Sequence, residues 1–226
     1  MGEIHVYVII SYRARGKHTD RKPQLDFLIP YMSGYLNGQG MKYTLIVIEQ
    51  NDDELFNYGK LKNCGFLEAK KLFKDGEVNA LVFQNVDIIP KKIRYTTYPP
   101  GITNASGWKD GCGSLCFFDA QSFETTNGFP NNIIGYGGED VSLVQRCFKE
   151  NITVWHHDFR GIPEYIVELD TTYREDLSRN KENCEMMWHD LSEDRWRSNG
   201  LSDCNYTVDK ITHNTDINYY HIWVSW

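Results

Sequence analysis

The sequence contains no long apolar segment and no signal-like beginning. Residues 1–10 lead directly into a β-branched strand pattern, and no run elsewhere resembles the roughly 20 apolar residues that cross a bilayer. If the 226 residues are the whole natural chain, this predicts a cytoplasmic protein without a transmembrane segment.

Paired cysteines and positive charge are also scarce. The six cysteines are scattered without a C-x-x-C pair, which argues against a structural zinc site and predicts buried thiols. The formal net charge of −7 and the lack of a dense Lys/Arg stripe argue against a nucleic-acid binder. An anionic nucleotide remains compatible with this charge, because a divalent cation can supply the positive charge that its phosphates need.

Aromatic residues, by contrast, are plentiful. They make up 14% of the chain and include six Trp and fourteen Tyr. Such rings suit the stacking of sugars, although each one alone is equally well explained as a core side chain. The length of 226 residues predicts a single domain over residues 1–226 with a sizeable core.

The first half of the chain alternates between strand and helix patterns. The strands are expected at 5–10, 43–49 and 80–84, and the helices at 24–36 and 57–72, with Pro30 kinking the first helix. This order predicts an α/β fold with a mostly parallel central sheet flanked by helices. Ligands of such sheets bind at the carboxyl ends of the strands, so Arg13, Arg15 and Asp87 should converge there.

The second half, residues 95–226, is less regular. Strands are expected at 114–118, 152–155 and 165–169, and a helix at 139–150. The stretch 95–132 is rich in Gly, Pro, Asn and aromatic residues, so this half is expected to receive a second substrate. The charged segment 171–185 lacks apolar anchors and predicts a mobile loop or lid.

Two segments carry candidate chemistry. Asp87 follows a buried strand, where its carboxylate could bind a cation that bridges two phosphates, although an Asp in this position is more often a turn or cap residue. The segment Gly135–Asp140 places glycines and two carboxylates immediately before a helix, whose amino terminus would keep Asp140 ionised as a proton acceptor. A plain acidic N-cap explains only part of this pattern.

These segments together resemble the β-1,4-galactosyltransferase family. The similarity covers about residues 9–206 and is most specific from Asn127-Gly-Phe-Pro-Asn-Asn132 through Tyr136-Gly-Gly-Glu-Asp140. The resemblance implies a GT-A type, Rossmann-like fold, with 1–94 as the nucleotide-sugar-binding half and 95–226 as the acceptor-binding and catalytic half. It also implies UDP-sugar donors, Mn²⁺ or alternatively Mg²⁺ as cofactor, and inversion at the anomeric carbon.

The resemblance assigns the donor site residue by residue. Ser11-Tyr12-Arg13-Ala14-Arg15 is similar to the family's nucleotide-binding loop, Phe56-Asn57-Tyr58 to Phe-Asn-Arg, and Asn85-Val86-Asp87 to Asp-Val-Asp. Tyr58 thus replaces an arginine that helps to hold the donor, and Asn85 replaces an aspartate. The implied donor-binding residues are Ser11, Tyr12, Arg13, Arg15, Asn57, Tyr58, Val86, Asp87 and Gly113.

The acceptor and metal sites follow from the same resemblance. Tyr136, Gly137, Gly138, Glu139 and Asp140 match the acceptor site, with Asp140 as the catalytic base. Asp87 matches a metal ligand, whereas the family's Met-x-x-His ligands have no direct counterpart. A one-residue shift in the alignment places Asp170 as an oxygen ligand.

The resemblance therefore predicts an enzyme that moves a hexose, galactose or a related sugar, to a hydroxyl of a glycan or glycoconjugate. Because Asn85 and Tyr58 depart from the family pattern, an inactive sugar-nucleotide or glycan-binding relative is one alternative, and a nucleotide-sugar pyrophosphohydrolase is another. A Golgi lumenal location is expected only if the chain is a truncated catalytic domain.

Overall fold

The computed structural model describes residues 3–14, 21–95, 101–105, 110–157, 159, 162–169 and 177–226. Two predicted site residues, Arg15 and Asp170, lie outside these ranges, as do residues 171–176 of the predicted lid. The strands are β1 (Ile4–Tyr12), β2 (Lys42–Gln50), β3 (Val78–Asn85), β4 (Ile88–Pro90), β5 (Ile102–Asn104), β6 (Leu115–Asp119), β7 (Val154–His156), β8 (Ile166–Glu168), β9 (Thr207–Asn214) and β10 (Tyr219–Ser225).

The helices are α1 (Lys22–Gly38), α2 (Tyr58–Lys70), α3 (Ala120–Thr125), α4 (Glu139–Lys149) and α5 (Asn180–Ser192), with short 3₁₀ helices η1 (Leu177–Arg179), η2 (Arg195–Ser198) and η3 (Leu201–Asp203). Pro30 lies inside α1, as predicted.

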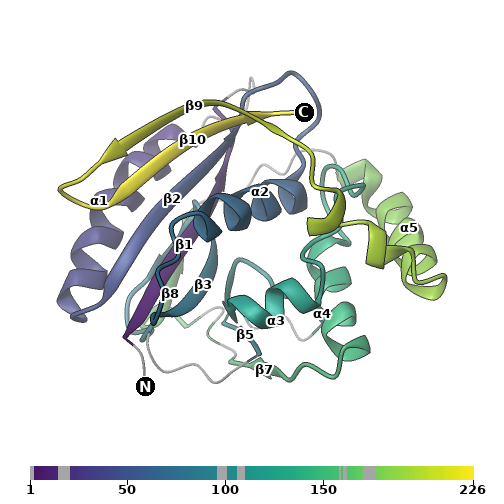
Figure 1. Ribbon diagram of the computed structural model, residues 1–226, viewed down its shortest axis with the longest axis horizontal. Helices are drawn as coiled ribbons and strands as arrows, with labels where there is room; N and C mark the ends of the chain where they lie inside the picture. The colour runs from purple at the N-terminus through teal and green to yellow at the C-terminus, as the bar shows by residue number, and fades with distance from the viewer. Residues whose placement is uncertain are drawn as a thin grey trace.

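One sheet organises the molecule (Figure 1), with its strands in the order β7-β5-β6-β3-β1-β2-β10-β9. The central pairs β3–β1, β1–β2 and β2–β10 are parallel, whereas β6 is antiparallel to both β3 and β5, and β9 is antiparallel to β10. The sheet contains strands from both halves of the chain. A mostly parallel central sheet in an α/β fold is therefore confirmed.

Both faces of the central strands are buried, which explains why their sequences are continuous apolar runs. On one face, Val8 and Ile10 of β1 pack with Leu28 and Met32 of α1. On the other face, β1 shares a core with α2, α3 and α4, which lie together on that side of the sheet in Figure 1.

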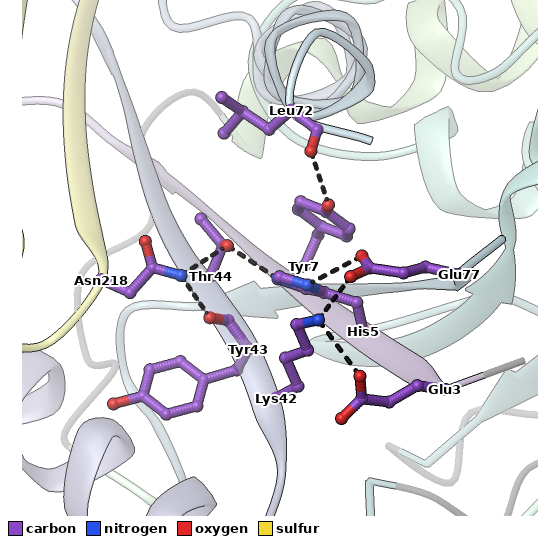
Figure 2. Close-up of polar contacts among 9 residues, drawn as sticks. All are labelled: Glu3, His5, Tyr7, Lys42, Tyr43, Thr44, Leu72, Glu77 and Asn218. Carbon is purple, nitrogen blue, oxygen red and sulfur yellow. Dashed lines mark hydrogen bonds and ion pairs between the residues drawn. The ribbon is translucent and has the colours of Figure 1, made fainter. Parts of the chain in front are cut away.

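The amino-terminal ends of the strands are held by polar contacts (Figure 2). His5 of β1 contacts Thr44 of β2 at 2.9 Å, and its Nδ1 lies 3.2 Å from a carboxylate oxygen of Glu77, just before β3. Asn218, in the turn between β9 and β10, donates to the Tyr43 carbonyl at 2.6 Å. Burial lowers the pKa of His5, although Glu77 opposes that shift. Neighbouring strands are thus tied together at this edge, opposite to the strand ends that the sequence assigns to ligands.

Two expectations about the second half were wrong or incomplete. Residues 180–185, expected to belong to a mobile loop, form the first turns of α5 instead, because Asn183 and Met187 are buried against the rest of the protein. The β9–β10 hairpin was not predicted. Only Ile222 and Val224 of β10 are buried, although the β10 sequence Tyr-Tyr-His-Ile-Trp-Val-Ser is rich in aromatic and β-branched residues that favour strands.

Candidate functional site

The site begins where β1 and β3 end side by side. Ser11 of β1 is in register with Asn85 of β3, so Arg13 and Asp87 leave the same carboxyl edge of the sheet. Three buried polar atoms here, Ser11 Oγ, Asn85 Oδ1 and Arg13 Nε, have no hydrogen-bond partner within the described ranges. Arg13 and Asp87 thus follow the ends of two neighbouring strands, whereas Arg15, the third residue predicted to converge with them, lies outside the described ranges.

Asp87 has one oxygen engaged and one available. Its side chain is 5% exposed, and Oδ2 accepts a 2.6 Å hydrogen bond from Arg21, just before α1. Oδ1 is buried and has no hydrogen-bond partner in the described part of the chain. The preceding residue, Val86, is buried in the core and anchors this turn.

The strand β8 lies beside Asp87. The Leu169 backbone N–H donates to the Asp87 carbonyl at 2.8 Å, and β8 pairs with β4, which begins at Ile88. The chain therefore reaches Asp170 immediately after a residue that contacts Asp87, but Asp170 itself is not described. Among the described residues, no group of three or more His, Cys, Asp and Glu side chains forms a ready metal cluster.

The amino terminus of α2 lies between the two predicted halves of the site. Asn57 caps the helix by accepting from the Lys60 N–H at 2.9 Å and donates to the Asn131 carbonyl at 2.6 Å. Tyr58 begins the helix, and its buried hydroxyl has no hydrogen-bond partner among the described groups. Burial raises the pKa of Tyr58 well above its usual value, and the charges of Asp87 and then Glu139 add to the shift. The negative charges of both carboxylates therefore act on the Tyr58 hydroxyl, which stays protonated and can donate a hydrogen bond.

Lys62 is a buried cation that the sequence analysis did not assign to the site. Its side chain is 1% exposed, and its Nζ lies 4.1 Å from the ring centroid of Tyr58 and 4.6 Å from that of Phe129. The ammonium has no hydrogen-bond partner within the described structure, so the two rings are its contacts. Lys62 follows Tyr58 by about one helical turn, which could have indicated a shared face.

The glycine-rich loop before α4, residues 135–138, requires glycine at two of its positions. Gly137 and Gly138 have φ values of 97° and 94°, in the left-handed region that favours glycine. A Cβ at Gly137 would also stand 2.0 Å from Asn180 Oδ1 of α5. From the same helix, Asn183 donates to the carbonyls of Ile134 at 3.0 Å and Tyr136 at 3.1 Å. The helix α5 therefore shapes this loop.

The two acidic residues that follow have different surroundings. Burial, and next the charge of Asp140, raises the pKa of Glu139 to about 7, while Lys62 acts in the opposite direction. Asp140 Oδ1 accepts from the Val141 N–H at 2.8 Å, and Oδ2 faces Gly111 so closely that a Cβ there would stand 2.4 Å away. The two residues begin α4, whose amino terminus favours negative charge.

The segment from Gly111 to Ser114 connects Asp140 to the sheet edge. Gly113 adopts a φ of 47°, and the Ser114 carbonyl accepts from the Asn85 N–H at 2.8 Å. One short segment thus contacts Asp140 at one end and the end of β3 at the other. Sequence reasoning did not assign Arg21, Gly111 or Asn183, because their roles arise from contacts with residues far away in the chain.

The mixed sheet flanked by helices, with polar groups gathered at its carboxyl edge, defines a GT-A type glycosyltransferase fold. The catalytic domain of Drosophila β-1,4-galactosyltransferase 7, crystallised with xylobiose, superposes with a TM-score of 0.78 at 20% identity, covering 98% of this chain and 94% of that one. A mutant of that Drosophila enzyme, in complex with manganese, UDP-Gal and xylobiose, matches with a TM-score of 0.75 at 17% identity, again covering 98% of this chain and 94% of that one.

The chain belongs to the β-1,4-galactosyltransferase family. Residues 2–98 match the model for the N-terminal region of glycosyl transferase group 7, and residues 101–168 match the model for the N-terminal domain of galactosyltransferase. Human β-1,4-galactosyltransferase 4 is 28% identical over 92% of this chain and 60% of its own length. Human β-1,4-galactosyltransferase 1 is 34% identical over 66% of this chain and 38% of its own length.

The expectation of a cytoplasmic protein is wrong. The β-1,4-galactosyltransferases that the chain matches are Golgi type II membrane enzymes. The chain spans about 60% or less of the length of the two human relatives above, so its first residues are no guide to location. Within the described ranges, no helix is both long and apolar enough to cross a membrane.

Proposed function

We propose that this protein is an inverting, metal-dependent glycosyltransferase that moves galactose or a related hexose from a UDP-sugar to a hydroxyl of a glycan or glycoconjugate. Family membership supports the class of enzyme. The carrying observation is the segment from Gly111 to Ser114, which lies against the Asp140 carboxylate at one end and accepts from the Asn85 N–H at 2.8 Å at the other. A donor held at Asp87 would therefore lie beside an acceptor held at Glu139.

The donor site consists of the residues that end β1 and β3 and begin α2. An unpaired buried polar group costs about 1–3 kcal/mol, so a ligand that satisfies Ser11 Oγ, Arg13 Nε and Tyr58 Oη gains affinity from each. Arg13 provides the positive charge that a diphosphate requires. Tyr12, Arg15, Asn57, Val86 and Gly113 complete the proposed donor site.

The described residues supply one ligand for a divalent ion at this site. Asp87 presents a buried oxygen, Oδ1, without a hydrogen-bond partner in the described residues, and carboxylate oxygen suits Mn²⁺ and Mg²⁺. Asp170, which follows the residue bonded to Asp87, is the second proposed ligand. When bound, the ion would neutralise negative charge on the diphosphate leaving group.

The chemical step in this proposal is a single displacement. Asp140 accepts the proton of the acceptor hydroxyl as the hydroxyl oxygen bonds to the anomeric carbon and the bond to UDP breaks, which inverts that carbon. The Val141 N–H holds one oxygen of Asp140, and Gly111 limits where the other can lie. The carboxylate is therefore oriented before the substrates arrive.

The acceptor site consists of Tyr136, Gly137, Gly138 and Glu139 beside Asp140. Tyr136 offers a ring on which a sugar can stack, and Glu139 Oε2 is buried without a hydrogen-bond partner among the described side chains. When ionised, this oxygen would accept a hydrogen bond from an acceptor hydroxyl.

A donor panel tests the proposal. UDP release from several UDP-sugars is measured with glycan acceptors, in Mn²⁺, in Mg²⁺ and in chelator. We expect release that needs both an acceptor and a divalent ion, and an inverted anomeric configuration in the product. Nucleotide binding without product would indicate an inactive relative, and release of sugar phosphate and UMP without acceptor would indicate a pyrophosphohydrolase. Either outcome overturns the proposal.

A further inference from the structure

Two cysteines that are far apart in the sequence lie side by side. Cys64 is on α2 and Cys204 directly follows η3, and their Sγ atoms are 3.8 Å apart. Cys64 is buried, whereas Cys204 is partly exposed. We propose that Cys64 and Cys204 are a site of oxidative modification, at which a small-molecule disulfide such as oxidised glutathione converts them to an intrachain disulfide bond. This inference does not depend on the proposed function.

Distance and exposure together single out this pair, because Cys112 and Cys116, which also hydrogen-bond to each other, are both buried. A disulfide needs its sulfurs at about 2.05 Å, so the two Sγ atoms, now 3.8 Å apart, must approach by roughly 1.7 Å. Cys204 can supply this movement because it lies beyond a short 3₁₀ helix and its N–H is only loosely bonded to the Leu201 carbonyl, at 3.5 Å. Cys112, Cys116 and Cys147 are buried and closed to such an oxidant.

A bound metal is a poorer explanation for the pair. Two thiolates provide only half of a tetrahedral zinc site, and the described residues contain no group of three or more potential ligands. Oxidation requires only the two sulfurs and an external disulfide.

The reaction proceeds by two thiol–disulfide exchanges. The Cys204 thiolate attacks one sulfur of the oxidised glutathione, forming a mixed disulfide and releasing one glutathione thiolate. Cys64 then loses its proton and attacks the Cys204 sulfur, releasing the second glutathione. Two protein thiols are oxidised, and one glutathione disulfide is reduced to two glutathiones. Burial raises the pKa of Cys64, so the second exchange should be the slower one and should accelerate as the pH rises.

The bond would reinforce a connection that already exists in the fold. Asn63, which precedes Cys64, donates to Asn131 Oδ1 at 2.8 Å, and Asn131 donates to Asp203, which precedes Cys204, at 2.6 Å. A disulfide would join the same two elements covalently. Because the cysteines are 140 positions apart, the cross-link would restrict most of the unfolded chain.

The test combines peptide mapping with thermal unfolding. The purified protein is equilibrated with oxidised and reduced glutathione at several ratios, and its free thiols are then alkylated. We expect a linked peptide containing Cys64 and Cys204, and a fall from six free thiols to four. The unfolding midpoint should rise by several degrees on oxidation and return with dithiothreitol.

Matched variants make the test specific. Cys184→Ser removes a partly exposed cysteine elsewhere and should leave both the linked peptide and the redox-dependent shift intact. Cys204→Ser and, as a variant that keeps the core apolar, Cys64→Val should abolish both. Persistence of six free thiols under oxidising conditions, or glutathione that stays on Cys204 without any linked peptide, overturns the inference.

Discussion

The Asp140 carboxylate lies against Gly111, and a Cβ at position 111 would stand 2.4 Å from Asp140 Oδ2. No real Cβ packs this closely, so Gly111→Ala must displace the carboxylate. We expect kcat to fall by about tenfold to a hundredfold, because small displacements of a catalytic group are costly. Donor affinity, measured by UDP titration, should be unchanged.

Gly34→Ala is the matched control, because no atom lies within 4 Å of a Cβ at that position of α1. It should leave kcat unchanged and stabilise the helix by about 0.5–1 kcal/mol. In an Asp140→Asn background, Gly111→Ala should cost little more activity. If Gly111→Ala lowered kcat by the same factor in the Asp140→Asn background as in the wild type, Gly111 would not act through Asp140.

Replacement of Asp140 by asparagine keeps the shape of the side chain but removes its ability to accept a proton. General-base catalysis is worth about 10²–10⁴-fold, so kcat of Asp140→Asn should fall within that range while UDP-sugar binding persists. Initial rates and calorimetric titration measure the two effects separately. Wild-type turnover in this variant would remove Asp140 from the mechanism.

Lys62 should control the pH dependence of acceptor use. The pKa of Glu139 is about 7, and the positive charge of Lys62 holds it lower than burial and Asp140 alone would. If acceptor binding needs the ionised form, kcat/KM for the acceptor should rise through about pH 7. Lys62→Met should shift this rise to higher pH, whereas Lys62→Arg, which keeps the charge, should restore it.

The pH dependence of the unfolding free energy provides a second measure of the Glu139 pKa, independent of catalysis. Because the pKa of Glu139 is raised above its ordinary value of 4.5, the folded protein holds a proton that the unfolded chain releases between pH 4.5 and about 7. Stability should therefore decline across that interval, and Glu139→Gln should remove this part of the decline. An unshifted pH–rate profile in a well-folded Lys62→Met protein would exclude the role of Lys62.

Asp87 should be required for stabilisation by metal. A ligand present at 100 times its Kd stabilises the folded state by about 2.7 kcal/mol, so Mn²⁺ with UDP should raise the unfolding midpoint of the wild-type protein. Asp87→Asn should lose this increase, and chelator should abolish turnover of the wild type. Asp216→Asn, in the exposed turn of the β9–β10 hairpin, is the control. Equal metal-dependent shifts in all three proteins would exclude Asp87 as a ligand.

The sequence alone determined the elements whose local patterns are strong. The apolar runs of β1, β2 and β3 and the helical spacing of α1 are visible in the chain because these elements are buried on whole faces. The glycines before α4 and the two carboxylates that begin it could also be recognised in the sequence, because they occupy consecutive positions.

Only the tertiary structure decided which distant groups meet. Arg21 contacts Asp87 across 66 positions, and Asn183 supports the Tyr136 carbonyl across 47. The hairpin β9–β10 joins the sheet through the pairing of β10 with β2, and α5 packs against the glycine-rich loop. Hydrophobic periodicity records which faces are buried, but a hydrogen bond, an ion pair or a close Cβ approach between remote residues exists only once the chain has folded.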